Sequence, residues 1–248
     1  MFQRPHHQRI AQILLALDGP LLRRHHCYFG GGTAVALRHG EFRESVDIDF
    51  MVSDIDCYRR LRLLLNESRN SLVPLFRPEV TPQPWKPGSR VRIDQYGIRT
   101  TLPVADTPIK FEIILEGRIE LKEPDQDDTI CGIATLSVLD LTCTKLLANS
   151  DRWADDGIFS RDLIDLAVMQ PSTSQLRQAV AKAARAYGNA VTRDLDKAID
   201  KLQNREGWLE RCMSALNINL PKALLWEKIR ALKKKLPGKN RAAGDTNS

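Results

Sequence analysis

Two aspartates stand two positions apart in the run RESVDIDF over residues 43–50, where polar and apolar residues alternate. Such alternation predicts a strand, because successive side chains of a strand point to opposite faces. The face expected to pack into a core carries Val46, Ile48 and Phe50. The opposite face carries Arg43, Ser45, Asp47 and Asp49. Carboxylates held this close need a cation, and Mg²⁺ prefers oxygen ligands. We therefore expect Asp47 and Asp49 to bind Mg²⁺ or Mn²⁺.

Three glycines, Gly30, Gly31 and Gly32, precede this run and follow a short apolar segment at residues 27–29. A brief helix is expected over residues 33–37, because the following His39 and Gly40 form a typical helix stop. Glycine has no Cβ atom, so backbone N–H groups at such a helix start can approach the phosphates of a nucleotide. A DxD pair or a glycine run alone is common on protein surfaces, and the prediction depends on the two occurring together.

Together these segments resemble the first motif of the polymerase-β-like nucleotidyltransferase superfamily. In the forms GG-T-A and R-x-S-x-D-I-D they resemble the AbiEii/AbiGii-type toxin nucleotidyltransferases, including the MenT-like toxins. The resemblance extends over residues 28–166, because Lys145 and the R-D-x-x-D-L run at residues 161–166 match the second half of the family pattern. The sequence departs from that pattern at Gly32-Thr33, where the superfamily has Gly-Ser.

The resemblance implies a magnesium-dependent nucleotidyltransferase that moves an NMP from an NTP to an acceptor hydroxyl and releases pyrophosphate. It also implies the toxin of a toxin–antitoxin pair, with an antitoxin as partner. Some relatives act on tRNA 3′ ends, so RNA is the expected acceptor.

By the same resemblance, each predicted site residue has a role. Asp47 and Asp49 would hold the metal, with Glu112 as the third ligand, although the superfamily more often has aspartate there. The residues expected to contact the triphosphate are Gly31, Gly32, Thr33, Ser45 and Lys145. Asp162 would position Lys145, and the residues expected to be catalytic are Asp47, Asp49, Lys145 and Asp162.

Other interpretations stay open. Asp94 is the second candidate for the third ligand that the resemblance implies. Without the resemblance, Lys145 and Asp162 are surface charges of two helices, and Glu112 is a solvated carboxylate. The protein could instead modify a small molecule such as an antibiotic, an activity for which a basic C-terminus would be superfluous. It could also be a non-catalytic module that binds nucleic acid or a partner protein on the same fold.

The remaining pattern predicts an α+β fold with two domains. Residues 1–130 are expected to form a nucleotidyltransferase-type mixed sheet with flanking helices, and residues 131–248 a helical domain. In the first domain we expect helices over residues 4–18 and 53–68, the second starting with a capping box from Ser53. A proline-rich loop over residues 73–89 is then followed by strands over residues 89–96, 98–104 and 108–115. Helices of the second domain are expected over residues 137–149, 160–169, 174–187, 192–204, 207–216 and 221–236.

The net charge is +6, and residues 222–241 hold eight Lys or Arg against one acid, Glu227. This basic end predicts contact with an RNA backbone, the alternative being a solvated tail. No apolar run approaches the roughly 20 residues of a membrane span, and the N-terminus does not resemble a signal peptide, so we expect a cytoplasmic protein. The five cysteines include no CxxC, and their spacing indicates neither a disulfide framework nor a zinc site. The adjacent pairs His6-His7 and His25-His26 are expected at the surface.

Overall fold

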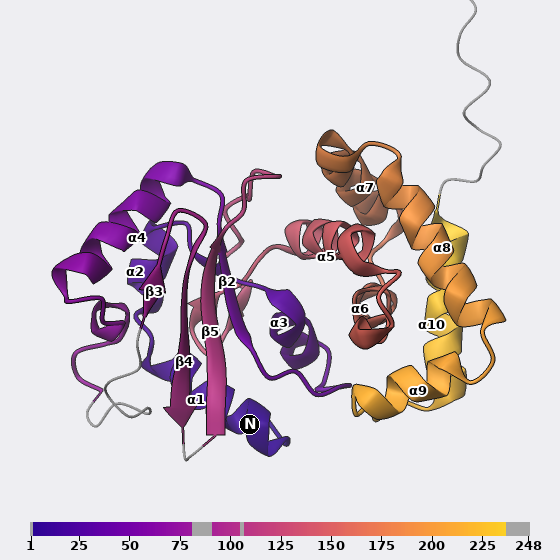
Figure 1. The fold of residues 1–248 in the computed structure, drawn as a ribbon, viewed down its shortest axis with the longest axis horizontal. Coiled ribbons are helices and arrows are strands. Elements are labelled where there is room, and N and C mark those ends of the chain that lie inside the picture. The colour runs from indigo at the N-terminus through magenta and orange to yellow at the C-terminus, as the bar shows by residue number, and fades with distance from the viewer. Residues whose placement is uncertain (1, 81–90, 105–106, 237–248) are drawn as a thin grey trace, which may run out of the picture.

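The computed structural model describes residues 2–80, 91–104 and 107–236. In Figure 1 a sheet with flanking helices lies beside a bundle of helices, and α3 (Gly31–Arg38) lies between the two. The predicted α+β fold is confirmed, with the sheet in the first half of the chain and the helical bundle in the second.

Within the described residues, five strands form a mixed sheet in the order β1-β2-β5-β4-β3. Their bounds are β1 (Tyr28–Phe29), β2 (Ile48–Val52), β3 (Arg92–Ile93), β4 (Gly97–Val104) and β5 (Thr107–Leu115). The β2–β5 pair is parallel, and the other neighbours are antiparallel. The register places Asp49 directly beside Glu112, so the two carboxylates share one face of the sheet.

The apolar residues of the sheet and the N-terminal helices share a core. Ile48 and Phe50 of β2 and Phe111 of β5 are fully buried there. The helices that flank the sheet are α1 (Pro5–Ala16), α2 (Gly19–Arg24) and α4 (Ile55–Glu67). Helix α2 follows α1 directly, because the Asp18 side chain caps it by accepting from the N–H of Leu21.

Helix α4 begins one residue later than the sequence suggested. Its N-cap is Asp54, whose carboxylate accepts a hydrogen bond from the Cys57 N–H at 2.7 Å. Ser53 instead accepts, through its Oγ, a hydrogen bond from the N–H of Leu121 at 2.8 Å. The predicted capping box from Ser53 is therefore wrong, because the hydroxyl is already used by a distant loop.

The second half of the chain is helical, apart from the short hairpin of β6 (Thr129–Ile130) and β7 (Ile133–Ala134). Its helices are α5 (Val138–Arg152), α6 (Arg161–Met169), α7 (Thr173–Tyr187), α8 (Ala190–Asn204), α9 (Trp208–Ala215) and α10 (Lys222–Lys235). Two single turns of 3₁₀ helix lie at η1 (Val73–Leu75) and η2 (Asp156–Ile158). Helix α5 is central, since it packs against α6, α7 and α8.

Two hydrophobic clusters divide the core, one under the sheet and one within the helical bundle. Helix α3 contributes to both: Ala34 and Leu37 belong to the first cluster, and Val35 and Ala36 to the second. The domain boundary near residue 130 stays a prediction.

The segment before β2 is not a strand, and Val46 does not face a core. Val46 is 44% exposed, and β2 begins only at Ile48. The backbone of residues 44 and 45 bonds outward instead, from the Glu44 N–H to the Leu216 carbonyl oxygen at 3.1 Å and from the Ser45 N–H to the His7 ring at 3.2 Å. These bonds hold the segment as a loop, which alternation alone could not reveal.

Of the strand expected over residues 89–96, the part that the structure describes starts at residue 91, and within that part only Arg92 and Ile93 pair with β4. Asp94 forms the following turn by accepting from the N–H groups of Tyr96 and Gly97. Residues 81–90 of the proline-rich loop lie outside the described residues. All five cysteines are free thiols, four of them buried. Among the helices of the described chain, none has the length and apolar character needed to cross a membrane.

Candidate active site

A cavity of about 300 Å³ lies where the start of α3, the polar face of β2 and β5, and helix α5 meet. Of the predicted site residues, those in its lining are Gly31, Gly32, Ser45, Asp47, Asp49, Glu112 and Lys145. The other charged residues of the lining are Arg43, Lys110, Arg118, Asp151, Arg152 and Arg161. Among the described residues, six cations and four carboxylates thus surround one space, a balance that suits a polyanion accompanied by a metal ion.

The glycines allow α3 to begin in contact with the carboxylate of Asp49. Gly31 has a φ of +68°, and a Cβ atom built on it would lie 2.3 Å from Asp49 Oδ2. A Cβ atom on Gly32 would lie 2.4 Å from Arg43 Nη2. Any larger residue would therefore push charged side chains away from the helix start, where backbone N–H groups have no intrahelical acceptor.

Thr33 lies behind the cavity and not in its wall. It is 1% exposed, and its Oγ1 lies 2.8 Å from Ser45 Oγ and 2.5 Å from the backbone oxygen of Asp47. The hydroxyl thus fixes the loop that carries Ser45 and Asp47. The structure does not bring Thr33 to the face where a triphosphate would lie.

His7 supports the same loop, although the sequence placed it at the surface. It is fully buried, because α1 packs its ring between Glu41 and Ser45. Its Nδ1 lies 2.8 Å from Glu41 Oε1, and its Nε2 accepts from the Ser45 N–H at 3.2 Å. This pair of contacts assigns the proton to Nδ1 and a neutral ring. Its partners lie 34 and 38 positions away along the chain, which no local pattern could predict.

Stability is expected to fall below pH 6.5 through His7. Burial lowers the pKa of this ring below its ordinary 6.5, although Glu41 opposes the shift. The unfolded chain therefore takes up a proton before the folded chain does, and the stabilisation present above pH 6.5 is lost as the pH falls toward the lower folded pKa. His7→Gln should flatten the pH dependence of the melting temperature between pH 8 and 5. An equally steep dependence in His7→Gln, with His25→Gln as control, would contradict this assignment.

Asp47 and Asp49 are suited to a divalent cation. Burial, aided by the neighbouring carboxylates of Asp47 and Glu112, raises the pKa of Asp49 to about 6, although Lys145 and Lys110 oppose the shift. A group in this position is stabilised as an anion when a cation is added. The donor oxygens, the raised pKa and the adjoining helix start together fit Mg²⁺ with a bound triphosphate.

Glu112 is adjacent but already paired. Its carboxylate contacts Lys110 Nζ at 2.5 Å and Arg99 Nε at 3.2 Å. Within the described residues, Asp47, Asp49 and Glu112 do not bring three ligand oxygens within 4.8 Å of one another. Glu112 as the third ligand stays a prediction.

Lys145 and Asp162 meet as the family pattern implied, but neither is a surface charge. Lys145 is 4% exposed and Asp162 is 2% exposed. The Lys145 ammonium lies 3.1 Å from Asp162 Oδ1, and Arg152 Nε donates to Asp162 Oδ2 at 2.7 Å. Although burial opposes ionisation, Lys145 and Arg152 hold the pKa of Asp162 well below its usual range. Asp162 does not line the cavity, but it contacts Lys145, which does.

A second buried aspartate joins the two halves of the chain. Asp165, fully buried on α6, accepts two hydrogen bonds from Arg43, at 2.6 and 2.8 Å, and lies 2.6 Å from Lys145 Nζ. Arg43 immediately precedes the loop that carries Ser45 and Asp47. Asp165 was visible in the sequence as the second aspartate of R-D-x-x-D, but its pairing with Arg43, 122 positions away, arises only in the fold.

A family model described as nucleotidyl transferase AbiEii toxin, type IV TA system, matches residues 15–221. The chain is similar in structure to a candidate nucleotidyltransferase from Helicobacter pylori, with 18% identity, a TM-score of 0.46, and coverage of 94% of this chain and 97% of that one. It is also similar to JHP933 from H. pylori, with 18% identity, a TM-score of 0.44, and coverage of 95% and 96%. No curated protein matches the sequence.

Proposed function

Since the chain belongs to the AbiEii family of nucleotidyl transferase toxins, we propose that it transfers an NMP from a magnesium-bound NTP to a hydroxyl of RNA, such as that of a tRNA 3′ end. The protein is a toxin nucleotidyltransferase. In the proposed reaction the acceptor oxygen bonds to the α-phosphorus, the bond from that phosphorus to the bridging oxygen breaks, and pyrophosphate and the hydroxyl proton are released. The natural partner would be an antitoxin that keeps this activity in check.

One observation carries the proposal: the first motif and Lys145, about a hundred positions apart in the sequence, line one cavity. Asp47 and Asp49 would hold the metal ion, which supplies charge neutralisation at the phosphates. The N–H groups of Gly31 and Gly32 and the side chain of Ser45 would orient the triphosphate. Lys145 would add a fixed positive charge to it.

RNA as the acceptor is supported by the charge of the molecule. Arg118, Arg152 and Arg161 lie in the cavity lining, where they can contact phosphates of an incoming strand. Helix α10 is also basic, but some of its lysines have partners within the protein. Lys222 contacts Glu210, Lys233 contacts Asp200, and Lys235 donates to the Pro171 carbonyl oxygen. Arg118 and Arg152 are also paired, with Glu116 and with Asp162. The arginines are better candidates for RNA contact than these lysines because they line the cavity.

The test incubates the purified protein and Mg²⁺ with each α-labelled NTP and total RNA. Label should appear in RNA together with an equal amount of pyrophosphate, and the Asp47→Asn variant should give neither. If label appears instead on an added aminoglycoside with RNA unlabelled, the enzyme modifies small molecules and the RNA proposal fails. If pyrophosphate is not released with any acceptor, the assignment of the cavity as a nucleotidyl transfer site fails.

A further inference from the structure

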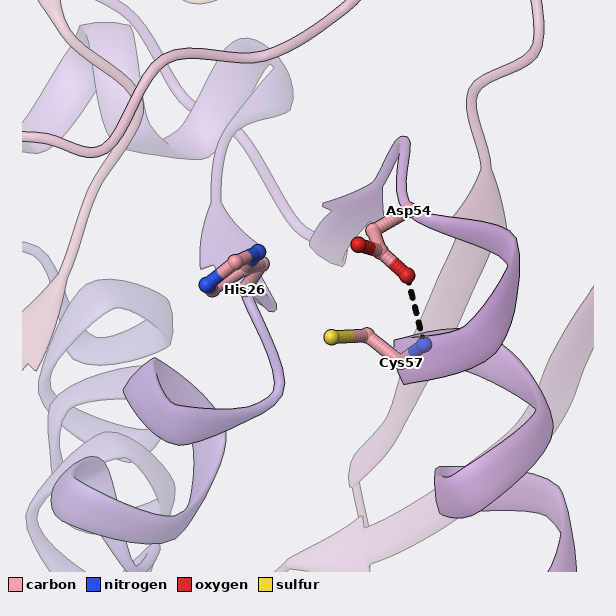
Figure 2. A group of neighbouring side chains, drawn as sticks. All are labelled: His26, Asp54 and Cys57. Atoms are coloured by element: carbon pink, nitrogen blue, oxygen red, sulfur yellow. Dashed lines mark hydrogen bonds between the residues drawn. The ribbon is translucent and has the colours of Figure 1, made fainter.

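A second group of possible metal ligands lies at the ends of β1 and β2. His26, Asp54 and Cys57 each offer one ligand atom, and the three atoms lie within 4.8 Å of one another. Figure 2 shows the imidazole of His26 facing the carboxylate of Asp54 and the sulfur of Cys57 across a common space. Within the described chain this is the one group of three or more such side chains that meets this distance.

The fold holds these ligands in place by two independent means. Antiparallel pairing sets Tyr28 opposite Met51, so the residues just before β1 and just after β2 lie side by side. The capping bond from the Cys57 N–H to Asp54 Oδ1 then fixes the carboxylate and the thiol on the same side of the first turn of α4 (Figure 2). His26 has a φ of +48°, a left-handed conformation that an L-residue adopts at some cost in energy.

We propose that His26, Asp54 and Cys57 bind one transition-metal dication of the Zn²⁺ class, at a site separate from Asp47 and Asp49. One nitrogen, one oxygen and one sulfur donor suit Zn²⁺, whereas Mg²⁺ requires oxygen ligands in octahedral geometry. His26 and Asp54 are exposed, so the fourth position of a tetrahedral ion is open to water.

Arg60 contacts the sulfur of Cys57. Its Nη2 lies 3.0 Å from Cys57 Sγ, where it can donate to a metal-bound thiolate and offset its charge. Cys57 is 2% exposed, and burial raises the pKa of its thiol. The metal must therefore displace a proton, so its affinity should decrease as the pH falls. The bound ion would connect the turn before β1 with the start of α4, the helix that follows β2. Strand β2 carries Asp49.

The test uses full-length protein freed of metal by a chelator and titrated with Zn²⁺, and with Co²⁺ as a spectroscopic probe. We expect a thiolate-to-Co²⁺ charge-transfer band that saturates at one ion per chain, in addition to any ion bound at Asp47 and Asp49. His26→Gln, Asp54→Asn and Cys57→Ser should each weaken binding by at least about tenfold. Cys131→Ser, at a half-buried thiol outside the group, and Asp49→Asn, at the other metal site, should leave both affinity and band unchanged.

The proposal is overturned if no thiolate band forms, if Zn²⁺ binds wild type and the three ligand variants equally, or if Mg²⁺ displaces Zn²⁺ at similar concentration. Cys57 is buried, and the Ser variant can fail to fold. His26→Gln and Asp54→Asn then decide, because both side chains are exposed and Asn can still accept the capping bond.

Discussion

Asp49→Asn is expected to abolish nucleotidyl transfer while raising the melting temperature of the metal-free protein. The substitution removes a metal ligand, and the rate should fall by about 10³-fold or more. It also removes a charge that is unfavourable without a cation. The pKa of Asp49, raised from 3.8 to about 6, corresponds to on the order of 2 kcal/mol of unfolding free energy at neutral pH. For a chain of this size, each kcal/mol is worth roughly 2–4 °C.

The pH dependence of this gain has a definite sign. A carboxyl whose folded pKa is raised binds its proton more tightly in the folded state, so wild type is relatively stable below pH 4 and loses that stability as the pH rises toward 6. The difference in melting temperature between variant and wild type should therefore be full above pH 6 and vanish near pH 4. Mg²⁺ should raise the melting temperature of wild type and have little effect on the variant.

Calorimetry in chelator and in Mg²⁺, beside the labelled-NTP assay, measures both effects. Glu44→Gln is a suitable control, since it removes a nearby carboxylate that does not line the cavity. Retained transfer in Asp49→Asn would remove Asp49 from the site. A lower melting temperature in metal-free Asp49→Asn would mean that this carboxylate stabilises the fold, and the electrostatic account of a cation site would be wrong.

Asp165→Ala should cost about 3–5 kcal/mol of folding free energy, because it leaves two buried cations without their shared anion. Arg43 is 3% exposed and Lys145 is 4% exposed, so little solvent reaches either cation, although Lys145 keeps its contact with Asp162. Activity should fall about 100-fold or more even at temperatures where the variant is folded, since Arg43 adjoins the loop of Ser45 and Asp47, and Lys145 lines the cavity.

Urea unfolding and a double-mutant cycle with Arg43→Ala test this role. The losses of unfolding free energy in the two single variants should not add up in the double variant, because each single variant already breaks the same bidentate pair. The exposed pair of Arg59 and Asp56 provides the matched control, and Asp56→Ala should change stability by less than about 0.5 kcal/mol. If the losses of unfolding free energy in the Arg43 and Asp165 cycle add, the contact between the two residues does not contribute to stability.

The sequence was sufficient for the fold class and for seven of the residues that line the cavity, but it also placed Thr33 and Asp162 there. The DxD spacing and glycines are local features, and in the mature fold Gly31, Asp47 and Asp49 lie where that pattern implies. Helices of the second half were predicted with small errors at their ends, since each has an apolar stripe and a recognisable start or stop. The catalytic roles of these residues stay predictions until activity is measured.

What the sequence could not supply were contacts that depend on register or on distant packing. The neighbouring positions of Asp49 and Glu112 follow from the β2–β5 register, and the loop at Val46 follows from bonds to His7 and Leu216. The resemblance placed Lys145 at the triphosphate, whereas the residue alone suggested a helix-surface lysine because lysine is rarely buried. The packing of α6 on α5 encloses it. The proposed ligands His26 and Asp54 form no sequence motif, because the pairing of β1 with β2 brings them together and not their spacing along the chain.

Helix α3 gives the molecule a mechanical property that neither half has alone. Its first turn touches Asp49, while Ala34 and Leu37 belong to one hydrophobic cluster and Val35 and Ala36 to the other. If the bundle rotated away from the sheet, α3 would therefore lose its apolar contacts in one of the two clusters. Because α3 packs in both clusters, it should stay fixed when the cavity opens to admit a large acceptor. The loops around the cavity should move instead.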